Sequence, residues 1–137
     1  MPFFTKTLYY KLEPDEVRNI TDDVIKVVKE SKVTNGLCNV FAKGSTSAVI
    51  ISEYEKGHIK DLFNALELIA PSAIYYEHHK AWNDDNGKSH VRACFLQHHL
   101  TMPIINNALC ISTWQNILLI NLDTRTRSRE VITSILY

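Results

Sequence analysis

The sequence predicts an α+β domain, in which a largely antiparallel or mixed β-sheet packs against two main helices and one short helix. Strand-like and helix-like segments are segregated along the chain, and the last third is rich in β-branched residues. A doubly wound α/β protein would alternate the two kinds of element throughout. Residues 1–137 contain no repeat, low-complexity tract or Pro/Gly-rich linker, so we expect a single domain.

The first half of the chain is expected to hold three strands and the two main helices. Apolar residues at helical spacing predict a helix that begins at Thr21 or Asp22 and ends near Lys32. The clearest helix covers 56–70, because its apolar residues form one stripe and Pro71 follows it. Aromatic and β-branched residues predict the strands, which cover 4–12, 37–42 and 48–52.

The second half begins with a loop at 83–87 and a short helix over 89–96, for which Ser89 is a candidate cap. Asn106-Asn107 suits a tight hairpin, because Asn tolerates a positive φ. A looser hairpin is expected at 123–128. Four strands are predicted around these turns: 100–105, 109–112, 116–122 and 129–136.

Composition limits the class of function. Lys and Arg number 15, as do Asp and Glu, so the formal net charge is zero. A non-specific nucleic-acid binder needs a basic excess, so we expect no nucleic-acid partner. We expect no membrane partner either, because no apolar run reaches the roughly 18 residues that span a bilayer. Without a signal-peptide pattern, and with Cys38, Cys94 and Cys110 interpreted as buried reduced thiols, the expected compartment is the cytoplasm.

Histidines and carboxylates are the main candidates for chemistry. His78 and His90 are separated by eleven residues, which is not an established metal-ligand spacing, so surface histidines remain an alternative. We interpret His98-His99 as surface residues. His58 and Asp61 share a helix face, either as a site or as solvated polarity. Glu53 and Glu55 would share a strand face if the strand continues, and a carboxylate near a histidine can act as a base or a ligand.

Three further features could bind a substrate. Gly44-Ser45-Thr46 places hydroxyl and N–H groups in a turn that can cradle an anion, or is a plain bulge. Trp114 is either core or an aromatic wall for a ring. The alternating arginines near the C-terminus could bind an anion, but an exposed hairpin face is the favoured interpretation; they are Arg125, Arg127 and Arg129.

Three blocks of this sequence resemble the YjbQ-like family, which is associated with secondary thiamine-phosphate synthase activity. The blocks are NGLCNVFAKGSTSAVIISEYEKG (35–57), YYEHHKAWNDDNGKSHVRACFL (75–96) and ISTWQNILLINLDTRTRSREV (111–131). The archaeal-type branch is the most similar. Some relatives have His at the position of Lys88, so the expectation of a metal site with a third imidazole is weaker for this chain. Some relatives also have Gly at the position of Gln97.

The resemblance implies an α+β fold, a homotrimer and a site in a cleft between subunits. It implies catalytic roles for four residues, His78, His90, Glu53 and Asp61, of which His78, His90 and Glu53 would also hold a divalent metal, Mg²⁺ or Zn²⁺. It implies substrate-binding roles for Ser45, Thr46, Arg92, Trp114 and Gln115. The implied reaction joins a pyrimidine diphosphate to a thiazole phosphate and releases pyrophosphate.

Two other functions stay open at this point. One is a metal-assisted hydrolase that uses the His/Glu site to activate water. The other is a non-catalytic oligomeric binding protein. In the enzymatic cases, the expected partner is a small molecule that carries a phosphate.

Overall fold

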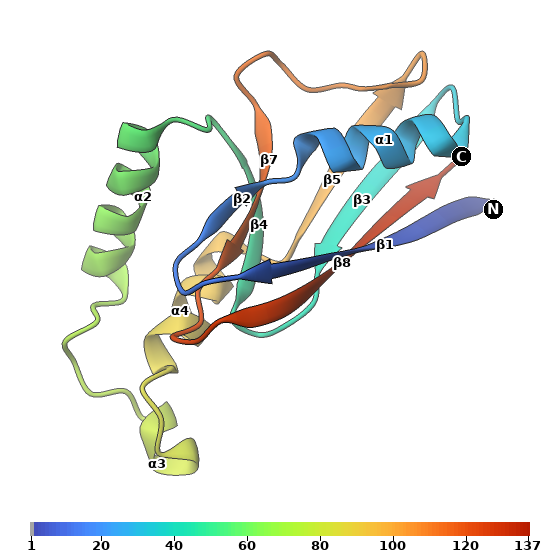
Figure 1. Cartoon of the computed structure of the whole chain (residues 1–137). Helices are drawn as coiled ribbons and strands as arrows, with labels where there is room; N and C mark the ends of the chain where they lie inside the picture. The colour runs from blue at the N-terminus through green and yellow to red at the C-terminus, as the bar shows by residue number, and fades with distance from the viewer. Residues whose placement is uncertain (1) are drawn as a thin grey trace.

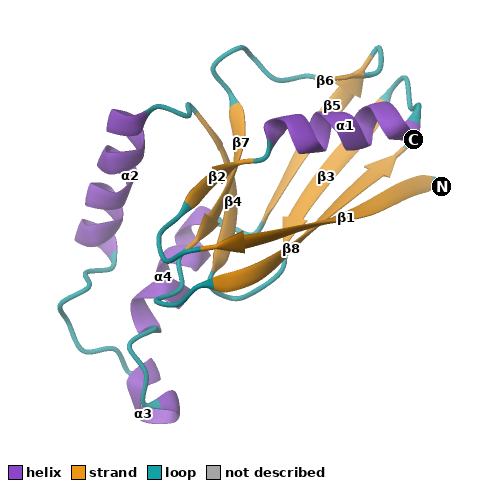
Figure 2. Cartoon of the chain, viewed as in Figure 1, coloured by secondary structure: helices purple, strands orange, loops and turns teal. Residues whose placement is uncertain are grey.

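Two antiparallel sheets and four helices make up the protein in a computed structural model that describes residues 2–137 (Figures 1 and 2). The five-stranded sheet has the order β1-β8-β3-β5-β6, and the three-stranded sheet has the order β2-β7-β4. The strands are β1 (Phe3–Leu12), β2 (Val17–Asn19), β3 (Gly36–Ala42), β4 (Ser47–Ser52), β5 (His99–Ile105), β6 (Ala108–Leu109), β7 (Asn116–Asn121) and β8 (Arg127–Leu136). The helices are α1 (Thr21–Ser31), α2 (Lys56–Ile69), α3 (His78–Trp82) and α4 (Gly87–Leu96).

The α+β prediction is confirmed, and every strand pair among the described residues is antiparallel. The β7 strand lies at the centre of the smaller sheet and is apolar on both faces. Ile117 and Leu119 face a core shared with α1 and the larger sheet, whereas Ile120 faces α2 and α4. A strand covered on both faces has a continuous apolar sequence, which is what this segment has.

The two main helices form where their apolar stripes predict them. On α1, Val24, Val27 and Val28 are buried against the larger sheet. On α2, Leu66 is buried and packs toward β4 and β7. The α2 helix lies along one side of the molecule, and the chain then leads to α3 at the periphery (Figure 1). No helix of the described residues is long and apolar enough to cross a bilayer.

One of the two predicted hairpins is confirmed. The other, at 123–128, is wrong, because β7 and β8 belong to different sheets and the segment between them crosses from one sheet to the other. Asn106 and Asn107 have φ values of 53° and 62°, as a tight hairpin requires. The strand expected over 109–112 is only Ala108–Leu109. Ser89 is not the cap of α4, because the helix begins two residues earlier and buries Ser89 within it.

The prediction that all three cysteines are buried is wrong for two of them. Cys38 is buried in the main core, where burial raises the pKa of its thiol to about 12. Cys94 and Cys110 are exposed. All three are free thiols, so no disulfide constrains the fold.

Candidate functional site

A polar cavity of about 500 Å³ lies where three segments meet. The turn between β3 and β4 forms one wall, and α3 with the first turn of α4 forms the second. The end of β7 and the start of β8 form the third. The β3 strand pairs with β8 in the larger sheet, and β4 pairs with β7 in the smaller one. The turn between β3 and β4 therefore lies beside the segment that crosses from β7 to β8, and residues separated by about 80 positions come together. We call this space the first cavity.

His78 and His90 touch inside the first cavity. Their ring centroids are 4.4 Å apart, with an angle of 35° between the ring planes. Asp84 lies 3.1 Å from His78, measured from carboxylate oxygen Oδ1 to ring nitrogen Nδ1. This contact fixes the orientation of the His78 ring. It engages Nδ1, so Asp84 does not occupy the other ring nitrogen, Nε2. A carboxylate that orients a histidine is the usual support of a general acid or base.

The two histidines differ in their environments. Burial lowers the pKa of His90 from its usual 6.5, and the neighbouring His78 lowers it further. Asp84 and Asp123 act in the opposite direction but do not outweigh these two causes. His90 is therefore a good candidate for a neutral base near pH 7, and the contact with Asp84 holds the His78 ring beside it.

Asp123 closes the floor of the cavity and is almost fully buried. Burial alone raises the pKa of its carboxyl group, but hydrogen bonds from Thr46, Asn86 and Arg127 lower it more, and the net shift is downward. Thr46 donates at 2.8 Å and Asn86 at 3.1 Å. The oxygens of the Asp123 carboxylate already accept hydrogen bonds from the protein, and few lone pairs are left for a ligand.

Arg129 supplies a buried positive charge beside this floor. Arg129 is only 6% exposed. One of its terminal nitrogens, Nη2, donates to Thr46 at 2.7 Å and to Asn121 at 2.5 Å. Both acceptors are neutral. Its Nε atom has no hydrogen-bond partner among residues 2–137. A buried guanidinium with donors to spare is the group best suited to receive an anion.

Gly44 allows the turn to approach this guanidinium. Its φ is +110°, a backbone conformation that residues with a side chain rarely adopt. A Cβ atom at this position would lie 2.5 Å from Nη1 of Arg129. Next to it, Ser45 is exposed at the cavity mouth and Thr46 is buried. The turn predicted from Gly44-Ser45-Thr46 therefore lies against a cation, as a turn that binds an anion would.

Four of the residues predicted for the site come together here: His78, His90, Ser45 and Thr46 all line the first cavity. The other five do not line it within one chain. Glu53 is exposed just after the end of β4, and Asp61 is exposed on α2. Trp114 and Gln115 are exposed in the segment before β7, where the Gln115 side chain accepts from the Ser112 N–H.

Arg92 is buried away from the first cavity and holds the end of α2. Its guanidinium donates to the carbonyl of Ala70 at 2.9 and 3.0 Å and lies 2.6 Å from a carboxylate oxygen of Glu67. Hydrogen bonds from Ser72 and then from Arg92 lower the pKa of Glu67 to about 2. The contacts of Arg92 are therefore those of a structural residue.

Two other predicted pairings resolve into local structure. The strand ends at Ser52, so Glu53 and Glu55 do not share a strand face. Glu55 instead caps α2 and accepts from the N–H groups of Gly57 and His58 at 2.8 and 2.7 Å. The His58 ring lies 2.7 Å from the Ser52 hydroxyl.

The predicted metal ligands do not assemble in one chain. His78 and His90 meet, but Glu53 does not line their cavity. Among residues 2–137, no group of three or more His, Cys, Asp or Glu side chains is placed to hold a metal ion. A structural or catalytic Zn²⁺ site needs at least three protein ligands. The described residues of one chain therefore do not fit the expected metal centre.

The sequence interpretation missed the most polar part of the site. Asp84, Asp123 and Arg129 were not chosen as site residues, and the arginines were interpreted as an exposed hairpin face. Arg129 is in fact buried, because β8 begins at Arg127 and strand alternation turns it inward with Val131. The signal available was this alternation, which places Arg129 in phase with the apolar residues of β8.

The fold and the cavity together define an α+β protein with a polar site lined by histidine and arginine. The family model for UPF0047 protein YjbQ-like matches residues 6–137. A UPF0047 protein of Methanothermobacter thermautotrophicus is 37% identical over 120 residues, which cover 88% of this chain and 82% of that protein. One from Archaeoglobus fulgidus is 33% identical over 117 residues, with coverages of 85% and 88%. The chain belongs to the YjbQ-like UPF0047 family.

Solved structures agree with this assignment. A YbjQ-like protein of unknown function from Sulfolobus solfataricus matches with a TM-score of 0.86 and 28% identity, over 98% of each chain. An uncharacterised protein of the same family from Clostridium acetobutylicum matches with a TM-score of 0.82 and 27% identity, over 94% of this chain and 99% of that one. The names of these relatives assign no activity, so the function must be argued from the site.

Proposed function

We propose that this protein is a small-molecule enzyme that binds a phosphate-bearing substrate in the first cavity. The observation that carries the proposal is the buried Arg129 guanidinium, which has unused donors within a cavity that also holds two touching imidazoles. Both carboxylates of the cavity are already engaged, Asp84 by His78 and Asp123 by four donors. An incoming anion therefore meets arginine and histidine donors rather than free carboxylates.

The reaction we favour is the transfer implied by the family resemblance. A bond forms between the ring nitrogen of a thiazole phosphate and the methylene carbon of a pyrimidine diphosphate. The carbon–oxygen bond to the diphosphate breaks, and pyrophosphate leaves with the electron pair. Arg127 and Arg129 would stabilise the charge that develops on this leaving group, and His78 is placed to give it a proton.

Incubation of the purified protein with both precursors and Mg²⁺ tests the reaction directly. Formation of thiamine phosphate, reduced by about a hundredfold in His78→Asn and in Arg127→Gln, supports the proposal. His99→Asn and Arg18→Gln are the matched controls. They remove an exposed histidine and a surface arginine that pairs with Glu16, and neither residue lines the first cavity. No product from the wild-type protein overturns the assignment of this reaction.

Metal-assisted hydrolysis is the second candidate and has less support. Its third ligand, Glu53, is outside the cavity within one chain. The two imidazoles would need a further ligand from the substrate or from a neighbouring subunit. A tightly bound transition metal in the purified protein, lost in His78→Asn but kept in His99→Asn, would favour this candidate.

We also propose that the chain assembles as a homotrimer. The support is the face of the larger sheet opposite α1, which exposes several large apolar side chains. They are Phe3, Leu37, Phe41 and Ile105, each at least 40% exposed. Large apolar side chains exposed on one face of a sheet are typical of protein interfaces. Assembly would also offer a neighbouring subunit to complete a site.

A further inference from the structure

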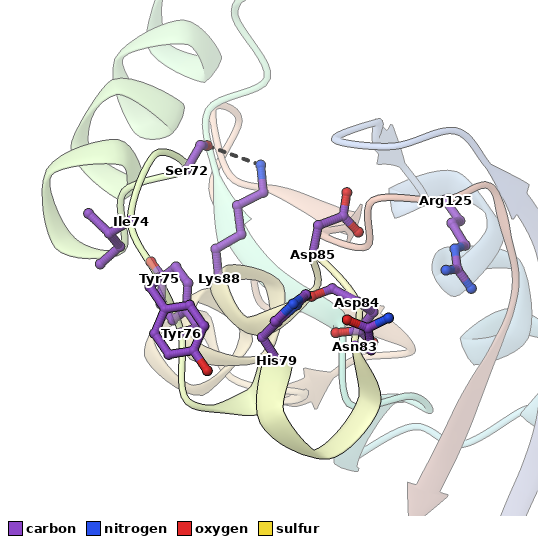
Figure 3. Close-up of a pocket in the computed structure, with 10 residues that line it drawn as sticks. All are labelled: Ser72, Ile74, Tyr75, Tyr76, His79, Asn83, Asp84, Asp85, Lys88 and Arg125. Carbon is purple, nitrogen blue, oxygen red and sulfur yellow. Dashed lines mark hydrogen bonds between the residues drawn. The ribbon is translucent and has the colours of Figure 1, made fainter.

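The structure has a second cavity, of about 470 Å³ (Figure 3). The loop between α2 and α3 forms one side, α3 and the loop after it form the base, and Lys88 and Arg125 complete the walls. Asp84 lines both cavities. Its carboxylate contacts His78 of the first cavity, and its backbone carbonyl lies 2.5 Å from the ring of His79 in the second.

The second cavity holds two cations without carboxylate partners. Lys88 donates to the Ser72 hydroxyl at 3.0 Å and forms no ion pair with any of residues 2–137. Within the same described part of the chain, the Arg125 guanidinium makes neither a hydrogen bond nor an ion pair. Asp85 is the one carboxylate of this cavity not bound to a histidine, and it accepts from Thr124. The cations therefore outnumber the free carboxylate.

Aromatic side chains form the opposite wall and are held in place. The Tyr76 hydroxyl donates to the carbonyl of Pro71 at 2.7 Å, and Gly87 packs so closely that a Cβ atom there would lie 2.4 Å from Cβ of Tyr76. Tyr75 meets the His79 ring edge to face, with centroids 5.9 Å apart, and is still 60% exposed. This leaves ring surface free for stacking with a ligand.

We propose that the second cavity binds a phosphorylated aromatic ring compound. The ring would stack on Tyr75 with its edge toward His79, and the phosphate would pair with Lys88. Arg125, on the far side of Asp85, would add positive charge to the cavity (Figure 3). The volume is in the range of small-molecule sites. Because Asp84 lines both cavities, this ligand would lie beside a substrate in the first cavity, as a reaction of two substrates requires. A role as the second substrate rests on the proposed function, whereas the binding of the ligand does not.

Calorimetric titration with phenyl phosphate tests the binding. In an Arg129→Gln background, in which the first cavity is weakened, we expect phenyl phosphate still to bind at one site, and inorganic phosphate to bind at least about tenfold more weakly. Adding Lys88→Gln and Arg125→Gln should cost roughly a further tenfold in affinity for phenyl phosphate. Tyr75→Ala should lower the same affinity, and Lys6→Gln, which removes an exposed lysine elsewhere, should not.

A second measurement avoids the Arg129 variant, should that variant fold poorly. In the wild-type protein, nuclear Overhauser effects between the phenyl protons and the Tyr75 ring are expected. Their absence, or an affinity unchanged by the Lys88 and Arg125 substitutions, overturns the second site. The proposed reaction fails on a different result, the absence of turnover in a protein that still binds phenyl phosphate at Tyr75.

Discussion

At the scale of single residues, the pair formed by His78 and His90 governs how the site titrates. Two imidazoles in contact do not both carry a proton easily, because each positive charge disfavours the other. Burial and His78 both lower the pKa of His90. We therefore expect an NMR titration to give His90 a pKa below 6.5 and His78→Asn to raise it toward 6.5.

The same shift has a consequence for stability. Because the folded state holds a proton on His90 less readily than the unfolded state does, stability should rise with pH up to about 6.5 and level off above it. The control is His99→Asn, which changes an exposed ring. An unaltered His90 pKa in His78→Asn would show that the two rings do not interact in solution.

Gln97 occupies a backbone conformation that favours glycine. Its φ is 76° and its ψ is 162°, and hydrogen bonds to Ala93 and from Val49 at 2.9 and 3.2 Å hold it there. Such a conformation costs a non-glycine residue about 1–3 kcal/mol. Glycine would adopt this conformation without that cost.

We predict that Gln97→Gly raises the free energy of unfolding by about 1 kcal/mol, after the added flexibility of the unfolded chain is subtracted. Urea denaturation measures it. Asn106→Gly is the matched control, because asparagine already tolerates its φ of 53° and should gain less. A loss of stability in Gln97→Gly would contradict the strained backbone.

At the scale of elements, Arg92 fastens the end of α2 to α4. It is 2% exposed, and its guanidinium satisfies the carbonyl of Ala70, which follows the last turn of α2. Arg92→Met should therefore lower the free energy of unfolding by about 2–3 kcal/mol, because it leaves that buried carbonyl without a donor. Thermal and urea unfolding would measure it.

This variant also separates two roles for Arg92. The family resemblance implies substrate binding, whereas the contacts within the chain are structural. We expect the folded Arg92→Met protein to bind inorganic phosphate as the wild type does. A stable variant with lost phosphate affinity would restore Arg92 to the site and would place a binding surface outside the first cavity.

Long elements could be predicted from the sequence, and short ones could not. The α2 helix and the β8 strand have several turns or alternations of pattern, so their periodicity stands out. The α3 helix has five residues and β2 has three, too few for any period. Their positions depend on tertiary contacts: β2 pairs along β7, and α3 is set by Asp84 contacts to His78 and His79.

The site was predictable only in part for a related reason. His78 and His90 were identifiable by residue type, and Ser45 with Thr46 by the glycine turn. Arg129 was not identified, because an arginine near a turn usually faces solvent. Its phase with the apolar residues of β8 indicates an inward side chain, but its partner Thr46 is 83 positions away and cannot be read from a local pattern.

At the scale of the whole molecule, the uncovered face of the larger sheet suggests assembly. Light scattering after gel filtration should give about three times the chain mass of 15.7 kDa for the proposed homotrimer. Leu37→Glu places a charge in the middle of that face and should yield a monomer. Lys26→Glu, at an exposed position on α1, which covers the other face of the sheet, is the control. A wild-type monomer would contradict the trimer.

The central claim is that the first cavity receives an anion on Arg129 beside the two histidines. An NMR titration with inorganic phosphate, followed through the ring protons of all six histidines, tests this most directly. We predict that the signals of His78 and His90 shift with phosphate, and that Arg129→Gln and Arg127→Gln each weaken the binding by roughly tenfold. Unmoved His78 and His90 signals, or equal affinity in both variants and in Arg18→Gln, would contradict the account.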